Sequence, residues 1–153
     1  MDEPVKASLV DLSEAPVPED FVVVRPGEQS ETYIVYTVLG GPPHLAEGER
    51  DLDLTYAPIL LEQIAEEIVK GQRAIILDLS PLVFIDSAGL QSLVAIRQRI
   101  AFNGRQVYVT GLQRAVKRVF TLMRLDTFMD TLASVPEAIA EVTATAAGKT
   151  GIA

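Results

Sequence analysis

The sequence predicts an α/β domain with a mixed β-sheet and helices packed on it, and two observations support this prediction. From residue 57 onward, short apolar runs rich in branched residues alternate with longer segments of helical spacing, as strands and helices do. Before residue 57, two strand-like runs, Phe21–Arg25 and Thr32–Leu39, are separated by the turn-forming residues 26–30. These two runs are expected to pair as an antiparallel hairpin at one end of the sheet.

The most informative segment runs from residue 73 to residue 104. Ala74–Leu79 is apolar except for one aspartate, which predicts a strand buried on both faces. A second apolar run, Leu82–Ile85, precedes a helix whose expected apolar positions are Leu90, Leu93, Val94, Ile96 and Ile100. Either Asp86 or Ser87 can cap this helix by accepting a hydrogen bond from an N–H group at its start, and Gly104 lies where the helix should end.

Three more helices are expected on the same grounds. Residues 58–70 have a proline in the first turn and Gly71 after the end, and the expected apolar positions are Leu60, Leu61, Ile64, Ile68 and Val69. A helix over Arg114–Met123 is expected to bury Val116, Val119, Phe120 and Met123. The last helix, Val135–Val142, follows Ser134, a residue type that favours helix starts.

The chain is expected to contain one folded domain over residues 21–142, to which residues 106–110 and 128–132 contribute the remaining strands. Residues 1–20 combine acidic residues with prolines and show no stable period, so a flexible N-terminal arm is expected. Residues 143–153 are mostly small and lack an apolar face, which predicts a flexible C-terminal tail.

Composition excludes several classes of function. The 153 residues include no cysteine, which excludes disulfides, a thiol nucleophile and a zinc–cysteine site. The formal net charge of −8 argues against a nucleic-acid partner, because phosphates would be repelled. No secretory signal and no apolar run of membrane-spanning length are visible, so we expect a cytoplasmic protein without membrane insertion.

Two short motifs are similar to enzyme motifs, but their surroundings argue against catalysis. Asp86-Ser87-Ala88-Gly89 resembles the serine neighbourhood of chymotrypsin-like proteases, yet the only histidine, His44, lies in a Gly-Pro-Pro loop. The segment Asp51-x-Asp53-x-Thr55 resembles the nucleophile motif of haloacid-dehalogenase-type phosphatases, but the polar residues before it predict a solvated loop. No catalytic residue, metal site or cofactor is therefore predicted.

Three stretches together resemble the STAS domain of bacterial anti-sigma-factor antagonists. They are DLSPLVFIDSAGLQSL, NGRQVYVTGL and AVKRVFTLMRLDTF, and the resemblance covers residues 30–142. It implies that Ser87, directly after Asp86, is phosphorylated by a partner serine kinase that is itself the anti-sigma factor. Ala88 stands where many members of the family have a second hydroxyl, which leaves Ser87 as the candidate in this motif.

The resemblance implies a phosphorylation-controlled protein-binding switch instead of an enzyme. The partner would contact Asp53, Asp86, Ser87, Ala88, Gly89 and Leu90, and a phosphatase acting on phospho-Ser87 would be a second partner. From the residues alone, Ser87 as a helix cap without regulation is an equally good interpretation.

Two departures from the family pattern motivate an alternative. Residues 42–49 form an insertion, and Arg50 replaces a loop glycine next to the expected partner surface. The alternative is a non-catalytic STAS subunit of a signalling assembly or of a membrane transport complex. The basic residues Arg114, Lys117, Arg118 and Arg124 are expected on an outer helix face, as a solvated surface or as a partner contact.

Overall fold

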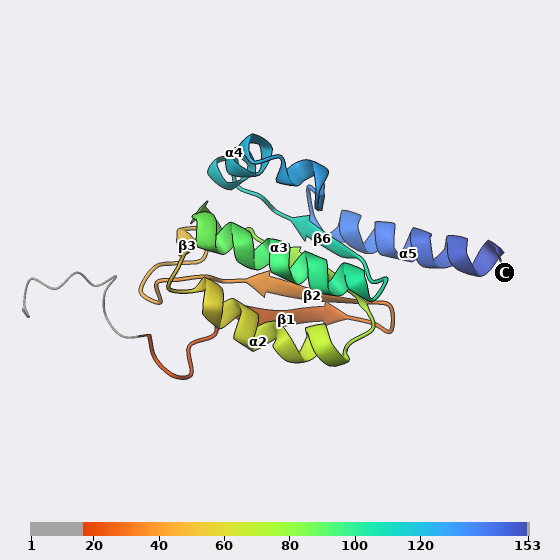
Figure 1. Ribbon diagram of the computed structural model, residues 1–153, viewed down its shortest axis with the longest axis horizontal. Helices are drawn as coiled ribbons and strands as arrows, with labels where there is room; N and C mark the ends of the chain where they lie inside the picture. Colours follow the sequence, from red (N-terminus) through yellow and green to blue (C-terminus); the bar gives the residue numbers. More distant parts are fainter. Residues whose placement is uncertain (1–16, 153) are drawn as a thin grey trace, which may run out of the picture.

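In the computed structural model, which describes residues 17–152 and side chains up to residue 146, a five-stranded sheet lies between helices on its two faces (Figure 1). The strand order is β1-β2-β4-β6-β7. The strands are β1 (Val24–Gln29), β2 (Tyr33–Val38), β4 (Ala74–Asp78), β6 (Val107–Thr110) and β7 (Asp130–Leu132). β1 and β2 are antiparallel and the other pairs are parallel, which confirms the predicted mixed sheet with an N-terminal hairpin.

Helices occupy both faces of this sheet. α2 (Ala57–Lys70) and α3 (Ser87–Phe102) cover one face, and α5 (Val135–Ile152) packs on the other (Figure 1). α4 (Arg114–Leu122) and the short 3₁₀ helix η2 (Leu125–Thr127) follow β6. Within the described part of the chain, no helix is long and apolar enough to span a membrane.

The central strand β4 explains why both faces need a cover. Ile75 and Leu77 belong to the core under α2 and α3, whereas Ala74 and Ile76 belong to the smaller core under α5. Successive side chains of a strand point to opposite faces, so a continuous apolar run has to be buried twice. The prediction of a doubly buried strand is confirmed.

A second, two-stranded sheet positions the start of α3. It consists of β3 (Arg50–Leu52) and β5 (Leu82–Ile85), which run parallel. The sequence predicted a solvated loop for the segment around Asp51, and that prediction is wrong for residues 50–52. Leu52 is fully buried because its side chain joins the main core, and this burial holds a segment with otherwise polar neighbours in a strand.

The first strand starts later than predicted and continues through the expected turn. β1 includes Pro26 and Gly27, and its register with β2 shifts between Pro26 and Gln29. A proline is tolerated there because β1 is an edge strand, where one N–H group faces away from the ladder. The N–H groups of Val23 and Val24 donate to Gln63 Oε1 on α2, at 2.7 and 3.2 Å.

Helix ends account for the other differences. Val69 and Met123 were predicted to be buried and are exposed, at the last turn of α2 and just after α4. The expected tail after Val142 is instead a continuation of α5 to Ile152. Alanine is the strongest helix former, and the alternating alanines of this segment support helix without an apolar face. The predicted N-terminal arm covers residues 1–20; residues 1–16 lie outside the described residues, and Val17 packs against the main core.

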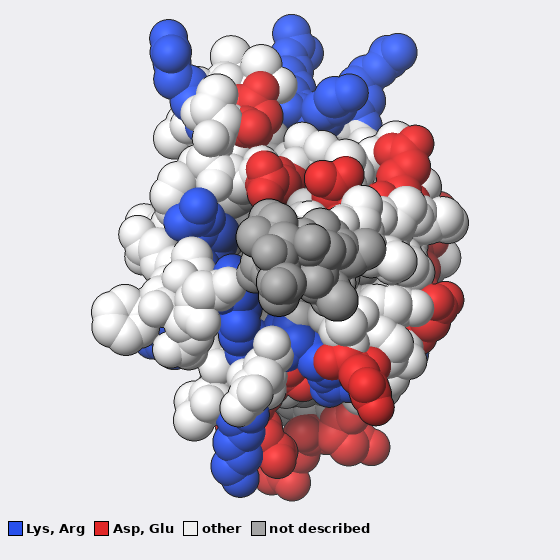
Figure 2. Space-filling model, turned by 90° about the vertical axis from the view of Figure 1, so that its right-hand side faces the viewer, with Lys and Arg blue, Asp and Glu red and all other residues white. Residues whose placement is uncertain are grey.

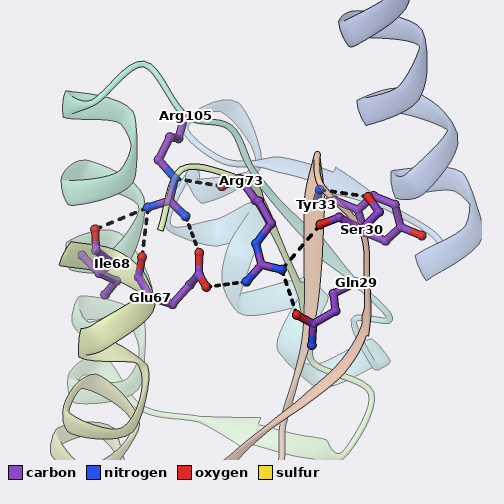
Figure 3. A network of polar contacts seen from close by, with 7 residues as sticks. All are labelled: Gln29, Ser30, Tyr33, Glu67, Ile68, Arg73 and Arg105. Atoms are coloured by element: carbon purple, nitrogen blue, oxygen red, sulfur yellow. Dashed lines mark hydrogen bonds and ion pairs between the residues drawn. The ribbon is translucent and has the colours of Figure 1, made fainter. Parts of the chain in front are cut away.

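A buried network of charged groups fixes the end of α2 (Figure 3). The Arg105 guanidinium donates to the carbonyl oxygens of Arg73, Glu67 and Ile68 at 2.8, 3.1 and 3.3 Å, and to Glu67 Oε2 at 2.8 Å. Arg73 donates to the other carboxylate oxygen of Glu67 at 2.9 Å. These bonds tie the last turn of α2 to the starts of β4 and β6 and satisfy carbonyl groups that the helix leaves free.

Candidate functional site

The site forms where β5 turns into α3. β5 ends at Ile85 and α3 begins at Ser87, so Asp86 is the one residue between them. Asp86 has an extended backbone, and its Oδ1 accepts a hydrogen bond from the Gly89 N–H at 2.9 Å. Of the two candidate caps, the structure selects Asp86.

Ser87 is left without a capping role. It is the first residue of α3 and is exposed, and its hydroxyl forms no hydrogen bond with any described residue. The alternative in which Ser87 only caps the helix is therefore wrong. A hydroxyl in this position can react without disturbing the bond that starts the helix.

The second oxygen of Asp86 connects the helix start to the preceding turn. Asp86 Oδ2 accepts from the Leu54 N–H at 3.1 Å, and the Asp86 N–H donates to the Leu52 carbonyl at 3.2 Å. Asp86 thus holds β3, the following turn and α3 together. Its position in the structure accounts for this residue without a catalytic role.

Asp53 lies in the turn that Asp86 holds. Its Oδ1 accepts from the N–H groups of Thr55 and Tyr56 at 2.9 and 3.3 Å, and its carbonyl accepts from the Ala57 N–H at 2.8 Å. Asp53 therefore supports the first turn of α2. The structure brings this predicted site residue close to the start of α3 from a distant part of the sequence.

The other three predicted contact residues are less accessible. Gly89 is buried, and a Cβ atom there would lie 2.2 Å from the Leu52 carbonyl oxygen, so only glycine allows β3 to approach α3 this closely. Leu90 is buried in the main core and Ala88 is half-buried. These three residues pack the start of α3, and their contact with a partner stays a prediction.

Exposed apolar side chains beside Ser87 were not predicted as site residues. Leu54 is 71% exposed and Phe84 is 50% exposed, and Val83 is also exposed. Leu54 follows Asp53, and Phe84 and Val83 belong to β5. The apolar run Leu82–Ile85 gave no signal for these exposed positions, because its burial does not alternate: Leu82 and Ile85 are buried, and the two residues between them are exposed.

The carboxylates around this turn are close enough to affect one another. Burial raises the pKa of Asp51, and the charges of Asp53 and Asp86 raise it further. None of the three forms an ion pair with a described residue. The surface next to Ser87 therefore combines negative charge with exposed apolar groups.

Arg50 and the insertion form a compact unit beside the site. Arg50 Nε donates to the Leu45 carbonyl at 2.7 Å, and its guanidinium lies 5.8 Å from the centre of the Phe21 ring. The Gly48 N–H donates to the Pro81 carbonyl at 2.9 Å, and Gln113 Nε2 donates to the Gly48 carbonyl at 3.0 Å. The insertion is thus fixed against the turn before β5.

Comparison with known proteins identifies the family. The sequence model of the STAS domain matches residues 48–138, more than half of the chain. The chain belongs to the STAS domain family. This assignment confirms the resemblance found in the three sequence stretches.

Solved structures with the same fold include signalling proteins and a larger chain. An anti-sigma factor antagonist from Mycobacterium paratuberculosis superposes with a TM-score of 0.63 at 21% identity, covering 84% of this chain and 99% of that one. The Bacillus cell fate determinant SpoIIAA in its phosphorylated form gives 0.57 at 20% identity, with 78% and 98% covered. SLC26A9 gives 0.59 at 15% identity, with 78% of this STAS chain but only 21% of that chain covered.

Proposed function

We propose that this STAS protein is a protein-binding switch of the anti-sigma factor antagonist type, controlled by phosphorylation of Ser87. Its partner would be a serine kinase that is also an anti-sigma factor. The observation that carries the proposal is the exposed Ser87 hydroxyl, which the cap made by Asp86 leaves free. The fold shared with an anti-sigma factor antagonist and with a phosphorylated SpoIIAA supports it.

The transfer step needs one group from this chain. Ser87 Oγ attacks the γ-phosphorus of ATP, the bond from that phosphorus to the bridging oxygen breaks, and ADP leaves. The hydroxyl proton passes to a base of the kinase, which also supplies the magnesium-bound nucleotide. Asp86 keeps its two backbone hydrogen bonds throughout, because the cap is not part of the reaction.

Phosphorylation changes the surface more than the fold. The modification adds about −1.5 to −2 charges at pH 7. The start of α3 offsets part of this charge, because N–H groups point outward at a helix N-terminus. On the partner side, the new charge joins Asp51, Asp53 and Asp86 beside the exposed Leu54 and Phe84, and docking would have to desolvate it. Binding is expected to weaken while the domain stays folded.

The reverse step would require a phosphatase that acts on phospho-Ser87. Hydrolysis of the phosphate ester by water restores the hydroxyl and releases inorganic phosphate. The exposed position of Ser87 gives a second enzyme the same access as the kinase. Kinase and phosphatase together would set the fraction of the chain that can bind.

A structural subunit is the second candidate function. The fold shared with a segment of SLC26A9 favours it, and so does the insertion that Arg50 and Gln113 fix beside the site. Purification from the source cells separates the two candidates: a kinase-like ATPase that co-purifies supports the switch, and transporter subunits support the structural role.

The decisive test is a phosphorylation assay with each kinase-type anti-sigma factor of the source genome. We expect one of them, with ATP and magnesium, to add one phosphate, which mass spectrometry locates on Ser87. Ser87→Ala should abolish the modification. Ser80→Ala, which removes another exposed serine from a turn, should not. Phosphate on another residue, with Ser87 unmodified, would contradict the proposal.

A further inference from the structure

A groove runs along one side of α3 and begins at Ser87. It has a volume of about 410 Å³ and lies between α3 and the segment that joins α4 to η2. Two glutamines contribute to the lining, and the other lining residues are Ser87, Leu90, Val94, Ala95, Met123 and Leu125. Because the lining is mostly apolar, the groove fits a segment with apolar side chains.

The surroundings of this groove are basic on the side of α4, although the whole chain carries a net charge of −8 and Asp51, Asp53 and Asp86 lie near the end of the groove at Ser87. Residues 87–125 include seven arginines and lysines and no acidic residue, although Asp86 and the exposed Asp126 directly flank this range. Four of the seven, Arg114, Lys117, Arg118 and Arg124, are exposed on α4 or just after it and form no ion pair with a described residue. Figure 2 shows Lys and Arg side chains projecting at the top of the molecule, at the height of α4, with Asp or Glu side chains among and below them. A matching occupant is acidic as well as apolar.

Arg124 lies at the edge of the groove, between the lining residues Met123 and Leu125. Its backbone has φ 58° and ψ 26°, in the left-handed region that arginine seldom adopts. Its carbonyl accepts two bonds from Thr127, at 2.7 Å from the hydroxyl and 3.3 Å from the N–H. The local fold thus holds a strained turn beside the apolar lining, and this turn carries a positive charge that has no ion pair with a described residue.

We propose that this groove binds the N-terminal segment of the same chain, residues 1–16. That segment contains four acidic residues and one lysine, so its net charge is −3. Its larger aliphatic residues are Val5, Leu9, Val10 and Leu12. Residues 147–153, at the other end of the chain, contain a lysine and no acidic residue, so they do not match a basic groove.

The segment can reach the groove from its point of attachment. The described chain starts at Val17, which packs against the main core, and the nearby Phe21 ring lies 6.0 Å from the Tyr56 ring. Tyr56 follows the turn that Asp86 connects to the start of α3, so the chain enters at the end of the molecule where the groove begins (Figure 1). Sixteen extended residues span up to roughly 55 Å.

Docking in this groove would place the segment beside Ser87. A partner that needs the same surface would then compete with the segment, and this consequence rests on the proposed function. The docking itself does not: it requires no kinase, phosphate or partner, and it is measured on the free chain. Failure of either proposal is therefore visible separately.

The test uses the absence of native cysteine. Ser13→Cys in the full chain gives one thiol for a nitroxide spin label. NMR spectra of the ¹⁵N-labelled protein should then show strong broadening at the amides of Gln91, Ala95 and Met123. Phe102, an exposed residue at the far end of α3, should broaden much less.

Variants separate specific docking from chance encounters. Leu9→Ser with Leu12→Ser should remove most of the broadening at the groove. Arg124→Asn should reduce it, because asparagine tolerates the left-handed backbone but carries no charge. Arg99→Gln removes a positive charge from the far end of α3 and should change nothing. No broadening above that at Phe102 would overturn the proposal. Broadening of a ¹⁵N-labelled chain by spin-labelled chains without ¹⁵N would overturn it as well, since a second copy would be the occupant.

Discussion

The two ends of the parallel strands use carboxylates in opposite ways. At the end where α2 stops, Glu67 is paired with both Arg73 and Arg105, and its side chain is 9% exposed. At the end where α3 starts, Asp51, Asp53 and Asp86 lie close together without an ion pair to any described residue. The first arrangement stabilises the fold, and the second leaves negative charge on the surface beside a free hydroxyl. Stability and binding should therefore respond to substitutions at different ends.

The largest effect is expected for Arg105→Ala. The Arg105 side chain is only 5% exposed and donates to Glu67 and to three carbonyl oxygens. Its removal leaves a buried carboxylate with one partner, which should lower the free energy of unfolding by about 3 kcal/mol. Urea denaturation measures this loss. Arg99→Ala, at an exposed position, should cost less than about 0.5 kcal/mol, and equal losses for the two variants would show that the buried ion pair of Arg105 does not stabilise the fold.

Asp86→Ala should have the next largest effect on stability. The variant loses the cap of α3 and the bond to Leu54, which together should cost about 2 kcal/mol. Urea denaturation again gives the value, and hydrogen exchange should speed up at the amides of Leu54 and Gly89. If the loss is below about 0.5 kcal/mol, Asp86 does not hold the turn as the structure indicates.

The pH dependence of the thermal stability of Asp51→Asn tests the effect of the carboxylates near the start of α3. Burial and the charges of Asp53 and Asp86 raise the pKa of Asp51 in the folded state above 3.8. The folded protein therefore binds this proton more tightly than the unfolded chain, and stability is lost as pH rises from 3.8 through the raised value.

The asparagine variant has no such loss. It should melt at a higher temperature than the parent protein at pH 7, and the difference should shrink toward zero below pH 3.8. Glu49→Gln controls for the removal of one negative charge from the same segment. A difference that is independent of pH would show that the Asp51 charge is not responsible.

Strong local patterns allowed much of this fold to be predicted from the sequence. β4 was predicted from a continuous apolar run, because a strand buried on both faces has apolar residues at successive positions. α3 was predicted from helical spacing, because a helix buried on one face has apolar residues every three or four positions. β1 was misplaced because its pairing with β2 continues through Pro26 and Gly27, two residue types that predict a turn. The bond between Arg105 and Glu67 joins residues 38 positions apart and left no local signal.

The site was predicted less completely than the fold. Ser87 was identified through the resemblance, but the choice between Asp86 and Ser87 as cap depends on backbone angles and on the position of Leu54. The sequence did not show that Gly89, expected at a partner surface, is needed for the close approach of Leu52. Exposed Leu54 and Phe84 could not be recognised, since an apolar residue in a sequence does not show which side of a small sheet is covered.

The most direct test of the switch compares Ser87→Glu with Ser87→Ala in two measurements, unfolding by urea and binding to the kinase identified by the phosphorylation assay. Both variants should unfold within about 0.5 kcal/mol of the parent protein, because the Ser87 hydroxyl forms no hydrogen bond with a described residue. Ser87→Ala should bind normally, and Ser87→Glu should bind at least about tenfold more weakly, or about 1.4 kcal/mol. Equal binding of both variants, or a large loss of stability in either, would contradict a switch at Ser87.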